Sequence, residues 1–174
     1  MALLLIACPE LIHTDLELIQ GYRKAHDKLY KIVDPHFTFV FPVHGISIAD
    51  FSAEIKKQLL GENSIMFCLK SAIANKDAFS ETYNAFLVPD EGYSQIVKLH
   101  DKLYSGALSA HHRTDIEYIP HITIGSSHDS AACQKLADEW NTNYFAICGS
   151  ISSFEIADYE NGVITSVEKI QLRK

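Results

Sequence analysis

The sequence predicts an α+β protein of two pseudo-symmetric lobes, each an antiparallel sheet with helices on its outer face, facing one another across a central groove. Two observations carry this expectation: strand-like and helix-like periodicities alternate along the chain, and the same order of elements occurs twice. Composition agrees, because 174 residues that are 47% apolar and 21% charged are typical of a globular protein. We expect a single bilobal domain over 1–174, with lobe-forming halves at about 1–76 and 77–174.

The first half is predicted to contain three strands and two helices. Its first strand is a short apolar run, and its second is rich in aromatic and β-branched residues. Gly61 follows the second helix in the position where glycine often ends helices. The expected ranges, in order, are strand 3–7, helix 15–31, strand 36–43, helix 50–60 and strand 64–74.

The second half repeats this order and adds a final strand. Asn161-Gly162 is a dipeptide typical of tight hairpin turns, and it lies between the last two strands. Pro89 is expected to end the first strand of this half. The expected ranges are strand 83–88, helix 93–108, strand 116–125, helix 129–140, and strands 144–157 and 163–172.

Net charge limits the partners. The chain has 15 Lys and Arg against 22 Asp and Glu, a formal charge of −7. Proteins that grip long duplex nucleic acid usually carry a basic surface, so this class is disfavoured, whereas a small nucleotide or an RNA end remains compatible. No stretch approaches the roughly 18 apolar residues of a membrane span, so we expect no membrane partner. We also expect a monomer.

The beginning of the chain and its cysteines favour a cytoplasmic protein. Residues 1–8, MALLLIAC, contain no Lys or Arg, so we expect a buried strand there rather than a secretion signal. No pair among Cys8, Cys68, Cys133 and Cys148 has the CxxC spacing of zinc or redox motifs. Cys8, Cys68 and Cys148 lie in apolar runs and are expected to be buried, unpaired side chains in a reducing compartment.

One short motif occurs twice. Residues 35–39 read PHFTF and residues 120–124 read PHITI, so that His36 and His121 occupy the same place in the two halves. Composition alone predicts roughly 0.005 matches to the pattern Pro-His-apolar-Thr in the chain. The pair is therefore a strong signal of a shared site.

Strand geometry places the polar side chains of each motif together. Side chains alternate between the two faces of a strand, so His36 and Thr38 share one face, as do His121 and Thr123. If the lobes are related by a pseudo-two-fold axis, the two faces converge on one groove. The intervening apolar side chains are expected to point into a core: Phe37, Phe39, Phe41, Ile122 and Ile124.

Two imidazoles and two hydroxyls suit phosphate chemistry. One histidine can accept a proton from a nucleophile while the other donates a proton to the leaving oxygen. Threonine hydroxyls can donate hydrogen bonds to the non-bridging oxygens, where charge must be stabilised. This chemistry requires neither a metal nor another cofactor, and the sequence contains no HExxH motif.

At these residues the sequence resembles the 2H phosphoesterase superfamily, which includes 2′-5′ RNA ligase-like proteins and cyclic nucleotide phosphodiesterases. The resemblance implies that His36 and His121 are catalytic and that Thr38 and Thr123 bind phosphate. It also implies a two-lobed fold and metal-free cleavage of 2′,3′-cyclic or related phosphodiesters. Bacterial members often carry an arginine soon after the second motif, whereas residues 125–128 here read GSSH, which disfavours long RNA.

Other residues are weaker candidates for contact with a substrate. His44 and His128 follow the two motifs in loops, where solvated histidines are the alternative. His111, His112 and Arg113 form the one compact cationic cluster of the sequence, which could instead be an exposed loop tip. Three aromatic residues could stack on a base or belong to the core: Tyr30, Phe41 and Tyr118.

The expected function is metal-independent hydrolysis of a cyclic phosphate, 2′,3′-cyclic or related, on a small nucleotide or an RNA end. One alternative is a nucleotide- or RNA-binding module of the same fold that keeps the histidines without useful turnover. Another is an unrelated α+β domain in which the motifs coincide. A groove lined by all four motif side chains would exclude the unrelated domain, and turnover would separate the enzyme from the binding module.

Overall fold

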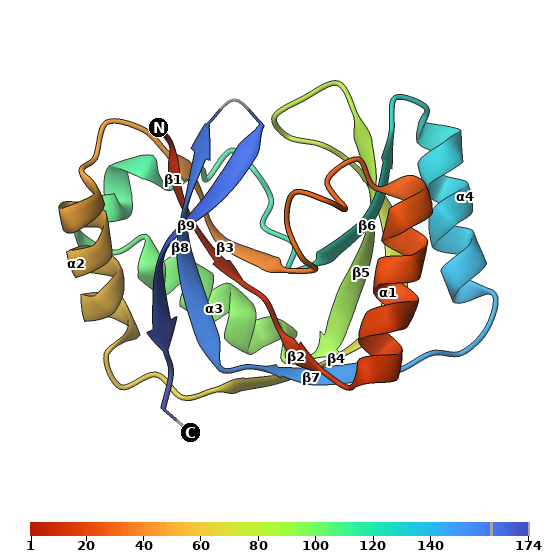
Figure 1. Cartoon of the computed structure of the whole chain (residues 1–174), viewed down its shortest axis with the longest axis horizontal. Helices are drawn as coiled ribbons and strands as arrows, with labels where there is room; N and C mark the ends of the chain where they lie inside the picture. The colour runs from red at the N-terminus through yellow and green to blue at the C-terminus, as the bar shows by residue number, and fades with distance from the viewer. Residues whose placement is uncertain (161, 174) are drawn as a thin grey trace.

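The computed structural model describes residues 1–160 and 162–173, and it contains two antiparallel sheets (Figure 1). Sheet A has the order β3 (Phe37–Val43), β1 (Leu3–Ala7), β8 (Ser153–Glu160) and β9 (Val163–Gln171). Sheet B has the order β2 (Glu10–Leu11), β7 (Ile147–Ile151), β4 (Ile65–Lys76), β5 (Tyr83–Glu91) and β6 (Ile122–Ser127). The predicted α+β class is confirmed.

Two helices pack on sheet B, and a third contacts strands of both sheets. Helix α1 (His13–His26) packs on β6, and α4 (Ser130–Asn141) packs on β4, β5 and β6 of sheet B. Helix α3 (Tyr93–Leu103) packs on β3 and also contacts β4, β5 and α2 (Ile48–Leu59). Figure 1 shows α1 and α4 side by side at one end of the molecule and α2 at the other.

Neither sheet is built from one half of the chain. Sheet A combines β1 and β3 with β8 and β9 from the other end of the sequence. The chain passes between the sheets twice by nearly continuous strands, from β1 to β2 through residues 8–9 and from β7 to β8 through Ser152. The expected halves at about 1–76 and 77–174 therefore do not correspond to the two sheets.

One apolar core includes residues of both sheets. Phe37 of β3 contacts Phe67 of β4 edge to face, with ring centroids 5.0 Å apart. Phe39 contacts Phe154 of β8 in the same way at 4.7 Å. All four rings are buried. Aromatic pairs of this geometry add to the stability of the fold beyond the effect of the area that they bury. The contact between Phe37 and Phe67 therefore holds β3 of sheet A against β4 of sheet B.

Three expected elements of the second half differ in the structure. The single strand expected over 144–157 is divided into β7 and β8, which belong to different sheets. The helix expected over 93–108 ends at Leu103, and a separate 3₁₀ helix, η1 (Gly106–His111), follows. Gly106 has a φ of 71°, a left-handed conformation that breaks the helical path. The strand expected over 116–125 begins only at Ile122, and the residues before it form a loop.

Strand β5 continues past Pro89 to Glu91, contrary to the expectation that proline ends it. The pairing of β4 with β5 is irregular next to Pro89, and a proline is tolerated at such an irregularity. At the other expected turn, Glu160 pairs with Val163 and Gly162 has a φ of 81°. Asn161 of that Asn-Gly pair lies outside the described residues.

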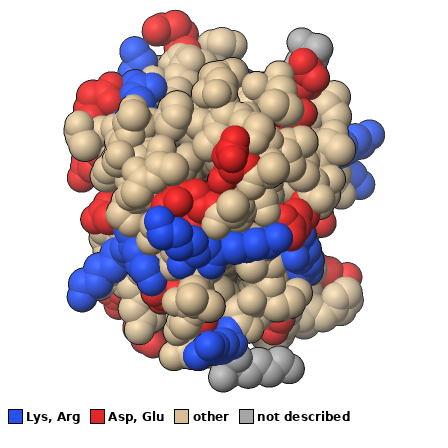
Figure 2. All heavy atoms as spheres, turned by 90° about the vertical axis from the view of Figure 1, so that its left-hand side faces the viewer, with Lys and Arg blue, Asp and Glu red and all other residues tan. Residues whose placement is uncertain are grey.

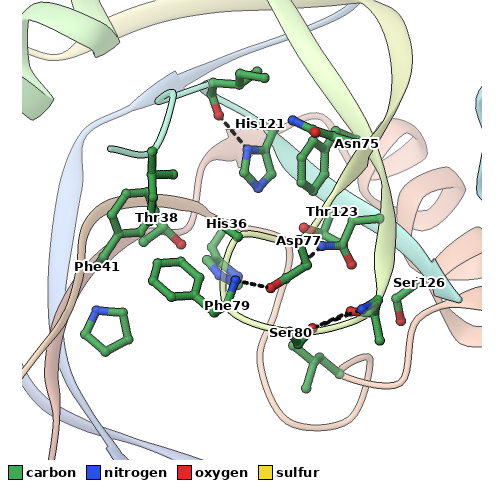
Figure 3. Close-up of a pocket in the computed structure, with 18 of the residues that line it drawn as sticks. His36, Thr38, Phe41, Asn75, Asp77, Phe79, Ser80, His121, Thr123 and Ser126 are labelled. Atoms are coloured by element: carbon green, nitrogen blue, oxygen red, sulfur yellow. Dashed lines mark hydrogen bonds between the residues drawn. The ribbon is translucent and has the colours of Figure 1, made fainter. Parts of the chain in front are cut away.

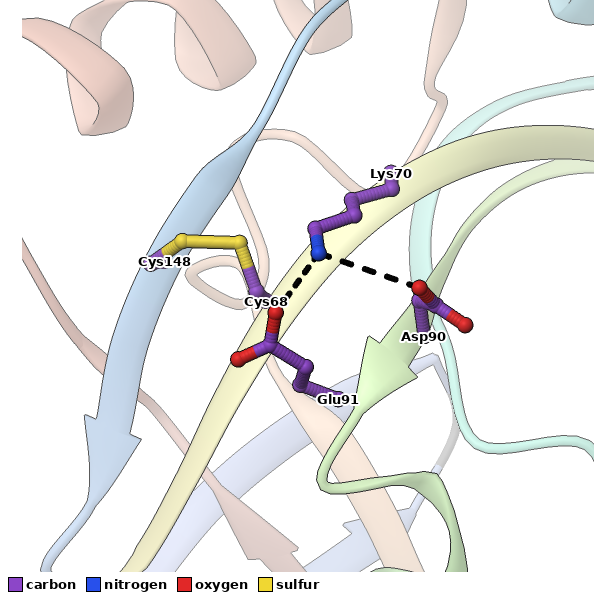
Figure 4. The surroundings of a disulfide bond; sticks show 5 residues. All are labelled: Cys68, Lys70, Asp90, Glu91 and Cys148. Carbon is purple, nitrogen blue, oxygen red and sulfur yellow. Dashed lines mark hydrogen bonds and ion pairs between the residues drawn. A yellow bond between two sulfur atoms is a disulfide. The ribbon is translucent and has the colours of Figure 1, made fainter.

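The prediction of buried, unpaired side chains at Cys8, Cys68 and Cys148 is wrong for all three. Cys68 of β4 and Cys148 of β7 lie opposite one another on neighbouring antiparallel strands and form a disulfide (Figure 4). Cys8 is unpaired but exposed, and Cys133 is unpaired and buried. The two cysteines are 80 residues apart in the sequence, so a motif defined by short spacing could not identify the pair. The cytoplasmic expectation rested partly on unpaired cysteines, and the disulfide removes that part of the argument.

Charged side chains on the outer face are paired within the chain. Figure 2 shows a band of basic side chains with acidic ones beside it on the face that carries α2. On α2, Lys56 pairs with Glu168 at 2.5 Å and Lys57 pairs with Glu54 at 3.4 Å. These lysines are therefore charge-compensated.

Within the described residues, no helix is long and apolar enough to cross a membrane.

Gly92 lets α3 begin directly against sheet B, and its replacement tests this packing. It has a φ of 83°, and a Cβ there would lie 2.5 Å from the Met66 carbonyl oxygen and 2.9 Å from Phe67 Cβ. Gly92→Ala should lower the free energy of unfolding by about 1–3 kcal/mol, measured by urea denaturation.

The matched control is Gly21→Ala in α1, where a Cβ would meet no atom within 4 Å. Alanine in a helix is favoured over glycine by roughly 0.5–1 kcal/mol, so this variant should be as stable as the wild type or more so. Wild-type stability of Gly92→Ala would contradict the close packing described here.

Candidate active site

A cavity of about 880 Å³ is lined by residues from the two sheets, and both motifs contribute to it (Figure 3). His36 lies directly before β3, Thr38 lies on it, and His121 and Thr123 stand in the same places at β6. Strands β3 and β6 are the outermost strands of sheets A and B. The structure thus brings all four motif side chains to one cavity, of a size typical for small-molecule sites.

A bulge in β3 changes which side chains reach the cavity. Thr38 pairs with Ile6 and Val40 pairs with Leu5, so Phe39 is an extra residue on β3. Beyond it the alternation is reversed, and Phe41 lines the cavity. The expectation that Phe41 points into the core is therefore wrong, because the bulge moves the side chains directly beyond it to the other face.

Strand β6 carries the same bulge at the same place. Thr123 pairs with Phe86 and Gly125 pairs with Ala85, so Ile124 is the extra residue. Ser126 then reaches the cavity, five residues after the motif histidine, as Phe41 does in β3. The two motifs are thus matched in backbone geometry as well as in sequence.

Both motif histidines are held by the same hydrogen bond. His36 Nδ1 lies 2.8 Å from the carbonyl oxygen of Asp34, and His121 Nδ1 lies 2.5 Å from that of Ile119. A carbonyl oxygen only accepts, so each Nδ1 carries a hydrogen and donates it. The neutral ring then has its lone pair on Nε2, the tautomer needed to accept a proton from a substrate or water.

Burial keeps both rings neutral. It lowers the pKa of His36 below its ordinary value of 6.5, and it lowers the pKa of His121 to about 4. His36 contributes further to the lowering at His121. His121 also stacks on Phe86, with ring centroids 3.6 Å apart. A bound phosphate would oppose these effects, because a nearby negative charge stabilises the imidazolium.

The numbers of basic and acidic residues that line the cavity are equal. Arg113 donates two hydrogen bonds to Asp115, at 2.8 and 2.7 Å, and Arg23 donates to Asp27 at 2.8 Å. Both guanidinium groups are therefore already paired. Four lining residues are basic and four are acidic: Arg23, Lys28, Lys76 and Arg113, and Asp27, Asp77, Asp115 and Glu117.

An aromatic rim lies at one side of the cavity. Phe41 and Phe79 meet edge to face, with centroids 5.4 Å apart, and the Arg113 guanidinium lies 5.6 Å from the Phe79 ring centroid. Phe79 is 57% exposed. These planar groups are available to stack on a base.

The loop that carries Phe79 is fixed by Asp77. The Asp77 carboxylate accepts hydrogen bonds from Phe79 N at 2.7 Å and from Asn84 Nδ2 at 3.0 Å. Five further residues line the cavity that the sequence did not indicate: Asp77, Phe79, Asn84, Phe86 and Ser126. None belongs to a recognisable motif, and their positions depend on the loop and on the bulge in β6.

Among the secondary candidates, the structure brings only Arg113 to the cavity. His44 and His128 are exposed and lie outside it, because each follows the end of its strand. His111 ends η1, and His112 stacks on Tyr104 with centroids 4.7 Å apart, so both lie elsewhere.

Of the aromatic candidates, only Phe41 lines the cavity. Tyr30 does not line it. Tyr118 lies beside the outer edge of β3, where its hydroxyl donates a hydrogen bond to the carbonyl oxygen of Thr38 at 2.9 Å.

A group of side chains that could hold a metal ion lies outside the cavity. His100, Asp101 and His112 place potential ligand atoms within 4.8 Å of one another. None of the three lines the cavity, and none of the four motif residues belongs to this group.

Comparison with known proteins identifies the family. The chain matches the 2′-5′ RNA ligase superfamily over residues 9–163 and belongs to it. This confirms the resemblance to 2H phosphoesterases that the two motifs indicated.

Individual relatives are distant. A Bacillus licheniformis protein provisionally named a phosphoesterase is 26% identical over 124 residues, which cover 71% of this chain and 66% of that protein. A similarly named protein of Geobacillus sp. is 26% identical over 111 residues, which cover 63% of this chain and 61% of that protein. The chain therefore matches less than two thirds of the length of these relatives.

Solved structures share the fold. Escherichia coli LigT in complex with 3′-AMP has a TM-score of 0.59 and 16% identity, and the match covers 99% of this chain and 98% of LigT. A Thermus thermophilus protein gives the same TM-score, identity and coverage. The two-lobed fold of LigT is therefore the fold of this chain.

The buried histidines predict that acid destabilises the protein. Burial lowers the pKa of His121 and His100 to about 4, from an ordinary value of 6.5 in the unfolded chain. Between these values the unfolded state binds more protons, so the free energy of unfolding should fall as pH falls from about 6.5 towards 4. Urea denaturation over this range measures the slope.

His100→Gln should flatten that slope, because one buried titrating group is removed while an amide donor remains. His44→Gln, at an exposed position, should leave the slope unchanged. Stability that stays constant or rises on acidification would contradict the burial of these rings.

Proposed function

We propose that the chain is a metal-independent phosphodiesterase that opens a cyclic phosphate, 2′,3′-cyclic or related, on a small nucleotide or an RNA end. The observation that carries the proposal is the matched pair of histidines. His36 and His121 line one cavity, and each has its Nδ1–H bound to the carbonyl two residues earlier. Few structural roles require the same tautomer at two facing sites.

In the proposed reaction, one histidine is neutral and the other is protonated. The neutral imidazole accepts a proton from water as the water oxygen forms a bond to phosphorus. The bond from phosphorus to one ring oxygen breaks, and that oxygen takes the proton of the imidazolium. The first histidine ends protonated and the second neutral, so a proton exchange with solvent restores the starting state.

Thr38 and Thr123 hold the phosphate in this scheme. Each lies two residues beyond its histidine on the same strand face and lines the cavity. Their hydroxyls donate to the non-bridging oxygens, where negative charge increases as water adds. The phosphate itself favours protonation of one histidine, since burial alone keeps both neutral.

A small substrate fits the rest of the cavity. The balanced charges of its lining disfavour a long polyanion, whose affinity depends on unpaired basic groups. In this proposal Phe41, Phe79 and Arg113, which contact one another at one side of the cavity, stack on one base. LigT, which shares the fold, has been crystallised with 3′-AMP and with ATP. All four motif residues come from one chain, so the proposed site is complete in a monomer.

Substitution of the motif residues tests the proposed roles. General acid–base catalysis contributes about 10²–10⁴-fold, so His36→Ala and His121→Ala should each lower kcat/KM by at least about 10²-fold. Thr38→Ala and Thr123→Ala should cost less, since each removes one hydrogen-bond donor. The assay uses 2′,3′-cyclic nucleotides and short RNAs with cyclic ends, and circular dichroism checks folding. Near-full activity in either histidine variant would exclude the two-histidine mechanism.

Metal and pH dependence separate this mechanism from that of a metallohydrolase. Activity should survive excess EDTA, because the chain's own hydroxyls and imidazolium meet the phosphate charge. The rate should fall at both low and high pH, since one histidine must be neutral and the other protonated. Loss of activity in EDTA with recovery on adding a divalent ion would instead assign the histidines to metal binding.

A further inference from the structure

The outer edge of β3 is completed by side chains instead of a strand. Because β3 is the last strand of sheet A, backbone groups on its outer side have no strand partner. Tyr118 OH donates to the Thr38 carbonyl at 2.9 Å, His100 Nδ1 donates to the Phe39 carbonyl at 2.8 Å, and Tyr104 OH accepts from Phe41 N at 2.8 Å. These bonds span the bulge that turns Phe41 into the cavity.

Unlike His100 and Tyr104, Tyr118 lies in the segment that leads directly into the second motif. It lies three residues before His121, and the carbonyl of the next residue, Ile119, accepts the His121 Nδ1 hydrogen at 2.5 Å. One side chain and one peptide unit therefore connect Thr38 of the first motif with His121 of the second. This connection joins the two edge strands beside the cavity.

The Tyr118 ring is fixed in place. It stacks on His100 with centroids 3.6 Å apart and planes 5° from parallel, and His100 is itself 2% exposed. Burial raises the pKa of the Tyr118 hydroxyl, so this group remains protonated and able to donate. Burial also lowers the pKa of His100 to about 4, so its neutral ring keeps donating to Phe39 at neutral pH.

We propose that the Tyr118 hydroxyl is a positioning group that sets His121 at the correct distance from His36 and Thr38. The proposal rests on the two-histidine function proposed above. Tyr118 does not line the cavity, and it acts through Thr38 and Ile119 without touching the substrate. A displacement of about 1 Å in an active site can cost roughly 10²-fold in rate, so the loss of this one bond should be measurable.

The test compares two single-atom deletions. Tyr118→Phe keeps the ring and its stacking but removes the hydroxyl, and kcat should fall at least about tenfold with a smaller change in KM. Tyr22→Phe is the matched control, since its hydroxyl donates to Leu136 O at 3.3 Å and to Glu139 at 2.9 Å on α4, and Tyr22 does not line the cavity. That variant should keep the wild-type kcat.

A second readout does not depend on turnover. In protein labelled with ¹⁵N-histidine, the ring signals of His121 should move in Tyr118→Phe and stay in place in Tyr22→Phe. A wild-type protein that opens no cyclic phosphate would overturn the proposed function, and the histidine signals would then decide the positioning role alone. Unchanged His121 signals, wild-type kcat in Tyr118→Phe, or an equal loss in Tyr22→Phe would overturn the positioning role.

Discussion

The site depends on one constraint: two edge strands, one from each sheet, contribute side chains to the same cavity. Strands β3 and β6 end sheets A and B, and each carries a histidine, a threonine and a bulge in the same order. Neither sheet alone has both histidines. The chain crosses between the sheets from β1 to β2 and from β7 to β8, so the edges are held together by continuous backbone and by one shared core.

The charged residues that line the cavity are equal in number for the two signs. Its arginines are already paired with carboxylates, and burial keeps His36 and His121 neutral. A phosphate placed between the rings would supply the charge that stabilises an imidazolium. This arrangement favours a small anion that brings its own charge over a polymer attracted by a basic surface. The balanced charge of the lining therefore bears on substrate size as well as on mechanism.

The fold class and the four motif residues of the site could be predicted from the sequence, because short segments of the chain carry the patterns that indicate them. The strand period placed His36 with Thr38 and His121 with Thr123, and the repeated order of elements predicted two lobes. The bulges could not be predicted, and so Phe41 was assigned to the wrong face. The Cys68–Cys148 pair was missed because its strands are adjacent only in the folded sheet. The halves expected from the repeat differ from the two sheets, because the last hairpin returns to β1.

Whether His36 and His121 act on one phosphate can be measured by titration with inorganic phosphate, followed by ¹⁵N-histidine NMR. The Nε2 signals of both histidines should shift together with a single affinity, while the signals of His44 and His128, which lie outside the cavity, should not follow. A shift of one motif histidine alone, or two different affinities, would contradict a shared phosphate site.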